Sequence, residues 1–76
     1  MKRYYHFFAT MDNGEKEYLT FDVTQISYLS HNESKGENGE TSIFVGVSHF
    51  NFAGPNNKSI YDGIRNIMNE LETKNE

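Results

Sequence analysis

The chain has 76 residues and no cysteine, and its formal net charge is −4, from seven Lys and Arg against eleven Asp and Glu. The absence of cysteine excludes disulfides and thiolate metal sites. The length indicates one small domain, 1–76, because single domains typically run from about 50 to 250 residues. So short a chain has a thin margin of stability, and small proteins without disulfides or metals often rely on self-association.

The N-terminal segment MKRYYHFFATM is too short and too polar for a signal peptide. No run approaches the roughly 18 apolar residues that a membrane span needs. We therefore expect a soluble, cytoplasmic protein with no membrane partner. The basic residues are scattered along the chain, whereas binding to phosphates needs a clustered basic surface. Direct nucleic-acid binding is therefore disfavoured, and a nucleic-acid-associated regulator is kept only as a third functional alternative.

The first predicted element is a hairpin around Asn13-Gly14, which lies between two runs of alternating apolar residues. Asn-Gly favours a two-residue type I′ turn, because this turn needs positive φ at both central positions. Side chains alternate across a strand, so the hairpin has two distinct faces. The face expected to form the core carries Tyr4, His6, Phe8, Leu19, Phe21 and Val23. The face expected to remain outside carries Tyr5, Phe7, Ala9, Met11 and Tyr18.

ISYLSH at 26–31 and TSIFVGVSHF at 41–50 predict a third and a fourth strand, and the polar segment 32–40 predicts a flexible loop or hairpin tip. If Asn38-Gly39 formed a two-residue turn, Tyr28 would face His49 and Ile26 would face Asn51. The following GPNN at 54–57 is ordinary turn chemistry that ends a strand. An Asn-rich loop of this kind also suits hydrogen bonding to a small polar ligand.

The last predicted element is a helix, because apolar residues recur at helical spacing from Ile60 to Leu71. Gly63 lies at the margin of this stripe and costs about 1 kcal/mol relative to alanine, which indicates a close approach of helix and sheet. TKNE at 73–76 predicts a frayed tail. The expected fold class is α+β, a four-stranded antiparallel sheet in the order β-β-β-β-α with one C-terminal helix packed on one face.

One helix covers only one face of such a sheet, and the other face carries more apolar side chains than a solvated surface should. The residues expected at a partner or dimer interface are Tyr5, Phe7, Tyr18, Phe50 and Phe52. The leading hypothesis is a small non-enzymatic protein-interaction module, a homodimer that binds and modulates an unidentified partner protein. The composition suggests an accessory or inhibitor protein of a phage or mobile element.

The sequence predicts no catalytic residues, no metal site and no cofactor. Ser48 and His49 are neighbours in a predicted strand, so their side chains point to opposite faces and cannot act together as nucleophile and base. His6 and His31 also lack a metal-ligand spacing, and we expect all three histidines to be packed or hydrogen-bonded. The alternative function is a protein that sequesters a small polar or nucleotide-like ligand at a dimer cleft. Its expected contacts are His49, Asn51 and Arg65, converging on one pocket.

Overall fold

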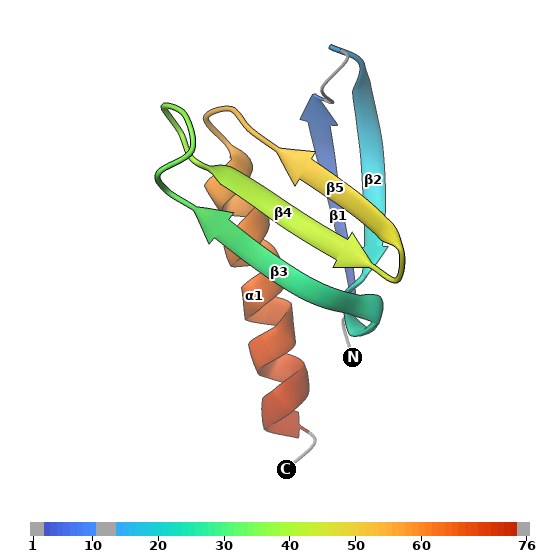
Figure 1. Ribbon diagram of the computed structural model, residues 1–76. Helices are drawn as coiled ribbons and strands as arrows, with labels where there is room; N and C mark the ends of the chain where they lie inside the picture. Colours follow the sequence, from blue (N-terminus) through green and yellow to red (C-terminus); the bar gives the residue numbers. More distant parts are fainter. Residues whose placement is uncertain (1–2, 11–13, 75–76) are drawn as a thin grey trace.

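The computed structural model describes residues 3–10 and 14–74 (Figure 1). In chain order its elements are β1 (Tyr4–Thr10), β2 (Lys16–Asp22), the 3-10 helix η1 (Val23–Gln25), β3 (Ile26–Asn32), β4 (Glu40–Val45), β5 (Ser48–Phe52) and α1 (Asn57–Lys74). The α+β class and the C-terminal helix packed on the strands are confirmed. The single four-stranded sheet is wrong, because the strands form a two-stranded sheet, β1-β2, and a three-stranded sheet, β3-β4-β5.

The β1-β2 hairpin pairs in a register one residue away from the predicted one. Phe7 lies opposite Leu19, and Phe8 lies opposite Tyr18. Strand β2 keeps Phe21 in the core as expected, but β1 turns Phe7 and Ala9 inward in place of Tyr4, His6 and Phe8. The ladder ends at Thr10 and Lys16, and the predicted turn and Met11 fall on residues 11–13, outside the described residues. A slip of one residue exchanges the two faces of a strand, because side chains alternate with a period of two.

The predicted strand 41–50 is two strands in the structure. The chain reverses at Gly46-Val47, and Val45 pairs with Ser48 across this two-residue turn. Gly46 has a φ of 59°, while no described non-glycine residue has a positive φ. This is the pattern of a type II′ turn, which places glycine at the first central position. Because Val45 and Val47 continue the apolar alternation on both sides of Gly46, the sequence reads as one strand.

The β3-β4 connection is a loop at the predicted position, and the alternative of a two-residue turn at Asn38-Gly39 is wrong. The strands pair from Tyr28 opposite Phe44 to Asn32 opposite Glu40, so residues 33–39 join them. Tyr28 therefore faces Phe44 rather than His49. Gly39 has a φ of 75°, and a Cβ there would lie 2.8 Å from Nε2 of His31. Glycine is thus required at this position by both the backbone conformation and the available space.

The core lies between two layers. One layer is the three-stranded sheet, and the other consists of α1 and the β1-β2 hairpin, which lie together behind that sheet in Figure 1. The buried apolar residues are Phe7, Ala9, Phe21, Val23, Ile43, Phe52, Ile60, Ile64 and Ile67. The helical stripe predicted from Ile60, Ile64 and Ile67 is therefore confirmed as the buried face of α1. Each of these Phe, Ile and Val side chains contributes about 1.5–3 kcal/mol when it is fully removed from water.

Helix α1 comes closest to strand β1 at Gly63. A Cβ at this position would lie 2.6 Å from both Cζ and Oη of Tyr5. The Tyr5 hydroxyl is 3.4 Å from the carbonyl oxygen of Ser59, to which it donates a hydrogen bond. The Tyr5 ring therefore occupies the space that a side chain at 63 would need, which accounts for a glycine inside the helix.

Asp22 connects the end of β2 to η1. Its carboxylate accepts hydrogen bonds from the backbone N–H of Thr24 at 3.0 Å and from the Thr24 hydroxyl at 2.6 Å, and it pairs with the Arg3 guanidinium. The hydrogen bond from Arg3, followed by those from Thr24, lowers the pKa of Asp22 from its ordinary 3.8 to about 2. The charged form of Asp22 thus fastens the N-terminal segment to the turn that leads into β3.

We expect Gly63→Ala to lower the free energy of unfolding by up to about 2 kcal/mol, because overpacking costs about 1–3 kcal/mol and the gain of about 1 kcal/mol in helix propensity offsets only part of it. In a Tyr5→Ala background the same substitution should instead stabilise the protein. Urea unfolding of the four variants of this double-mutant cycle measures the difference. An equal effect in both backgrounds would contradict the contact.

Acid unfolding should reveal the Asp22 cap. A carboxylate whose pKa is depressed by folding stabilises the protein above its unfolded pKa, and this contribution declines as the pH falls from about 3.8 towards about 2. We therefore expect Asp22→Asn to be less stable than the wild type at neutral pH, and the difference to shrink over that interval. Denaturant unfolding as a function of pH measures it, and a difference that does not depend on pH would be inconsistent with the proposed cap.

Candidate functional site

The outer face of the β1-β2 hairpin carries three exposed aromatic side chains, Tyr4, Phe8 and Tyr18, which we call the hairpin patch. Their exposed fractions are 45%, 56% and 80%. The rings of Phe8 and Tyr18 lie opposite each other across the two strands and meet edge to face, with centroids 5.2 Å apart. Phe8 and Tyr18 are therefore a packed aromatic pair in contact with solvent, and Tyr4 lies on the same face beyond His6 and Thr20.

Polar groups frame the hairpin patch and are already hydrogen-bonded or paired. Nδ1 of His6 lies 2.9 Å from the Thr20 hydroxyl oxygen in the neighbouring strand. The Arg3 guanidinium lies 5.3 Å from the centre of the Tyr4 ring and pairs with Asp22. These contacts hold the neighbouring side chains in place, and the polar residues Arg3, His6 and Thr20 are exposed beside the aromatic rings.

The predicted interface residues do not share one surface. Phe7 and Phe52 are buried, at 9% and 2% exposed, and their rings meet edge to face in the core with centroids 5.3 Å apart. Tyr5 and Phe50 are half-buried and pack against the same core. The expectation that Phe7 and Tyr5 remain outside the fold is wrong, because the hairpin register turns them towards α1. Tyr18 alone of the five is exposed as expected.

The predicted ligand contacts His49, Asn51 and Arg65 do not converge. The His49 ring stacks on Phe44, with centroids 4.0 Å apart, and Asn51 accepts a hydrogen bond from the Ser42 hydroxyl at 2.8 Å. Both lie on the sheet face opposite the core, whereas Arg65 lies on α1, which packs on the core face. No pocket lined by all three is found among the described residues.

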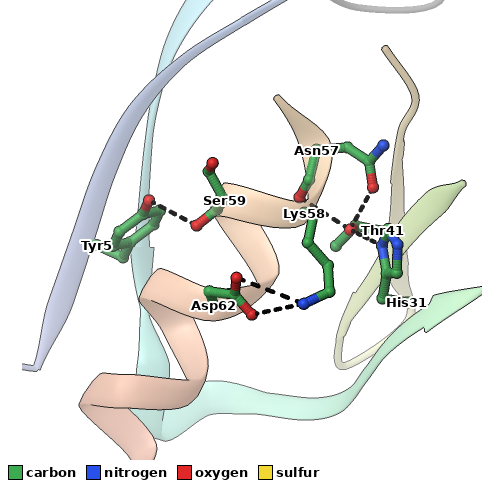
Figure 2. Close-up of polar contacts among 7 residues, drawn as sticks. All are labelled: Tyr5, His31, Thr41, Asn57, Lys58, Ser59 and Asp62. Carbon is green, nitrogen blue, oxygen red and sulfur yellow. Dashed lines mark hydrogen bonds and ion pairs between the residues drawn. The ribbon is translucent and has the colours of Figure 1, made fainter. Parts of the chain in front are cut away.

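An open groove of about 580 Å³ runs along the free edge of β3. It is lined by Tyr28, residues 30–33, and Lys58 and Tyr61 of α1. Lys58 is held by Asp62, with Nζ 3.1 Å from Oδ1 (Figure 2), and its ammonium lies 5.8 Å from the centre of the Tyr61 ring. The groove thus has one wall of exposed strand backbone and one wall from the first turns of a helix.

Asn57 is the buried polar centre next to this groove. Its Nδ2 lies 2.9, 3.2 and 2.8 Å from the carbonyl oxygens of Asn38, Gly39 and Gly54. Its Oδ1 accepts a hydrogen bond of 2.8 Å from the Thr41 hydroxyl, which in turn lies 3.0 Å from Nδ1 of His31 (Figure 2). Asn57 is therefore occupied by the protein itself, so the ligand reading of GPNN is not supported for this residue, and the turn reading agrees with its contacts.

Sequence reasoning missed the role of Asn57. It treated residue 57 as part of a turn, and nothing in GPNN distinguishes Asn57 from the exposed Asn56. The signal that could have drawn attention to it is the second Asn-Gly, Asn38-Gly39, whose carbonyls Asn57 holds. That signal was interpreted as part of a flexible loop or as a tight turn at a hairpin tip instead.

The described part of the chain, 3–10 and 14–74, holds no group of three or more His, Cys, Asp or Glu that could bind a metal ion. Over the same residues, no helix has the length and hydropathy to cross a membrane. The histidines lie apart and contact Thr20, Thr41 and Phe44 respectively.

Comparisons of this chain with protein-family models, with curated proteins and with solved structures find no match. The proposals below therefore rest on the geometry of this chain alone.

We expect Asn57→Ala to lower the free energy of unfolding by at least about 2 kcal/mol, because each buried polar group left without a partner costs about 1–3 kcal/mol. The backbone carbonyls of Asn38 and Gly39 would lose their shared side-chain donor, and the Thr41 hydroxyl, 0% exposed, would keep only the Asn57 backbone carbonyl, 3.0 Å away, as its acceptor on Asn57. Asn56→Ala is the matched control, since exposed substitutions usually change stability by less than about 0.5 kcal/mol. Urea unfolding compares the two variants, and similar costs would rule out a special role for Asn57.

Proposed function

We propose that this chain is a non-enzymatic protein-interaction module that docks a partner protein through the hairpin patch and modulates it by binding. The observation that carries this proposal is the exposure of Tyr4, Phe8 and Tyr18 on one face, at 45%, 56% and 80%. Contiguous exposed apolar patches commonly mark interaction sites in soluble proteins. Tyr and Phe are also among the residue types enriched at interfaces.

The size of the patch suits the centre of an interface. A fully covered aromatic side chain buries about 150–250 Å². The three exposed fractions together amount to almost two whole side chains, or about 300–450 Å² of aromatic surface. A standard interface buries about 800 Å² on each partner, so the patch would supply its apolar centre and the surrounding polar residues its rim.

Electrostatics also favour this face. The chain carries a net charge of −4, and yet the outer side chains of the two described strands include only one carboxylate, Asp22, which Arg3 neutralises. Lys16 lies at the other end of the same face. A partner therefore meets a neutral to slightly basic aromatic surface on an otherwise acidic protein, without the like-charge repulsion that it would meet elsewhere.

Affinity capture with matched variants tests the proposal. Bait proteins would be the wild type, the double variant Phe8→Ser with Tyr18→Ser, and the control Val47→Ser, which removes a fully exposed apolar side chain from the turn between β4 and β5. We expect a protein from an extract of the source cells to bind the wild type and the control. Binding to the hairpin variant should fall at least about tenfold, since loss of an interface hot spot costs 2 kcal/mol or more.

Circular dichroism must show that the hairpin variant remains folded, which its exposed positions lead us to expect. The captured protein would then be purified and titrated against all three baits. Equal affinity for the hairpin variant and the wild type would refute docking at the hairpin patch.

A further inference from the structure

The sequence contains two Asn-Gly dipeptides, at 13–14 and 38–39. In any peptide the backbone nitrogen that follows an asparagine can attack the asparagine side-chain amide, and a glycine there leaves this nitrogen free of crowding by a Cβ. Residues 11–13 lie outside the described part of the chain, so the surroundings are described for Asn38-Gly39. Two side chains, His31 and Asn57, contact this dipeptide.

The Asn38 side chain is available for this reaction. Asn38 is exposed and lies in the loop 33–39 between β3 and β4. Among the described residues, it is hydrogen-bonded through its backbone carbonyl and not through its side chain. The side-chain amides of Asn51 and Asn57, in contrast, accept hydrogen bonds from Ser42 and Thr41. The carbon that would be attacked is therefore free to turn towards the Gly39 nitrogen.

His31 presents a proton acceptor to Gly39. The Thr41 hydroxyl has a single hydrogen, which it donates to Asn57, whose Oδ1 and carbonyl oxygen lie 2.8 and 3.0 Å away. In the contact of 3.0 Å between this hydroxyl oxygen and Nδ1 of His31, the histidine must therefore be the donor (Figure 2). Nδ1 thus carries the proton of the neutral ring, and Nε2 carries the lone pair. Nε2 lies against Gly39, where an added Cβ would be 2.8 Å from it.

Asn57 donates a hydrogen bond to the atom that becomes negative when the Gly39 nitrogen loses its proton. A deprotonated peptide nitrogen shares its charge with the carbonyl oxygen of the preceding residue, which here is Asn38. The Nδ2 group of Asn57 has two hydrogens, and its two shortest contacts are with the carbonyl oxygens of Gly54, at 2.8 Å, and Asn38, at 2.9 Å. A donor already fixed at this position stabilises the developing charge without reorganisation.

We propose that Asn38-Gly39 is a self-modification site, at which His31 and Asn57 promote the conversion of Asn38 to aspartate and isoaspartate. Nε2 of His31 removes the proton of the Gly39 backbone N–H, and the Gly39 nitrogen forms a bond to Cγ of Asn38. The bond between Cγ and the side-chain nitrogen then breaks, and this nitrogen leaves as ammonia with the proton that His31 returns. Water opens the resulting five-membered imide at either of its carbonyls. One water is consumed and one ammonia is released, with no oxidation or reduction.

The modification changes the loop where α1 is attached to it. Both products carry a carboxylate in place of the Asn38 amide, next to the carboxylate of Glu37. Isoaspartate also routes the backbone through Cγ and lengthens it by one carbon, at a carbonyl that Asn57 holds. The start of α1 is therefore held less firmly against the sheet as the protein ages. This inference goes beyond the docking function and is independent of the hairpin patch, which lies in the other layer of the fold.

Peptide mapping by mass spectrometry of the wild type tests the site. Folded protein and protein unfolded in guanidinium chloride would be incubated at the same mildly alkaline pH, and the change from amide to carboxylate followed with time. In the unfolded chain, Asn38 and Asn13 should react at similar rates, because both precede glycine. In the folded protein, Asn38 should react at least about tenfold faster than in the unfolded chain, since a positioned base alone typically contributes about a hundredfold or more. A folded rate equal to or below the unfolded rate would overturn the proposal.

Two histidine variants test the role of the base in the folded protein. His31→Gln removes the base but keeps a side-chain N–H donor, and Asn38 should react at least about tenfold more slowly in it than in the wild type. The matched control is His6→Gln, because Nδ1 of His6 also contacts a threonine hydroxyl, that of Thr20 at 2.9 Å, but on the hairpin. This control should react at the wild-type rate.

Circular dichroism checks that both variants are folded, and the comparison of folded with unfolded wild type depends on neither. An unchanged rate in His31→Gln, or equal slowing in both variants, would overturn the proposal. Because partner capture is a separate measurement on the hairpin patch, either proposal can fail without the other.

Discussion

The arrangement of this fold depends on the hydrogen bonds of one buried amide, the Asn57 side chain. Asn57 is the first residue of α1, and its donors and acceptor contact the β3-β4 connection, the loop after β5 and the Thr41 hydroxyl on β4. The buried stripe of Ile60, Ile64 and Ile67 determines which face of α1 meets the core, and the Asn57 contacts fix the start of the helix against the sheet. Because buried polar groups tolerate few alternative arrangements, this one residue fixes where α1 begins and hence which side chains of the sheet it covers.

With α1 in this position, part of the core face of the three-stranded sheet remains to be covered, and the β1-β2 hairpin covers it. The hairpin supplies Phe7, Ala9 and Phe21 to the core. Both strands of the hairpin are needed in one register, because a slip of one residue would move these rings to solvent. The same register leaves Tyr4, Phe8 and Tyr18 outside, so the exposed aromatic surface is the direct consequence of how the core is filled. The register of the β1-β2 hairpin thus determines both the aromatic residues of the core and those of the exposed face.

Two surfaces with different chemistry result, and they lie in different layers of the fold. The hairpin patch is aromatic and framed by Arg3 and Lys16. Strand β3 itself carries no charged residue, and the groove along its free edge is lined by Tyr28, Lys58 and Tyr61 as well as by smaller polar residues. Aromatic side chains suit a partner with a complementary apolar surface, whereas strand backbone suits another strand.

Local patterns in the sequence determined the helical stripe of Ile60, Ile64 and Ile67, the need for glycine at position 63, the presence of strands at 26–31 and from 41 onwards, and the surplus of aromatic residues. The helix and the strands follow from the period of apolar residues, which depends on the local backbone alone.

Tertiary structure decided which face of β1 is buried, because Tyr4, Tyr5, Phe7 and Phe8 make both faces aromatic and only packing against Gly63 and Phe52 separates them. It also decided the turn at Gly46, which an uninterrupted apolar alternation conceals, and the role of Asn57, whose partners lie about 16 or more residues away in the chain except for Gly54. Contacts between distant residues carry no local signature, so the sequence alone predicted an interaction surface but placed it partly on residues that form the core.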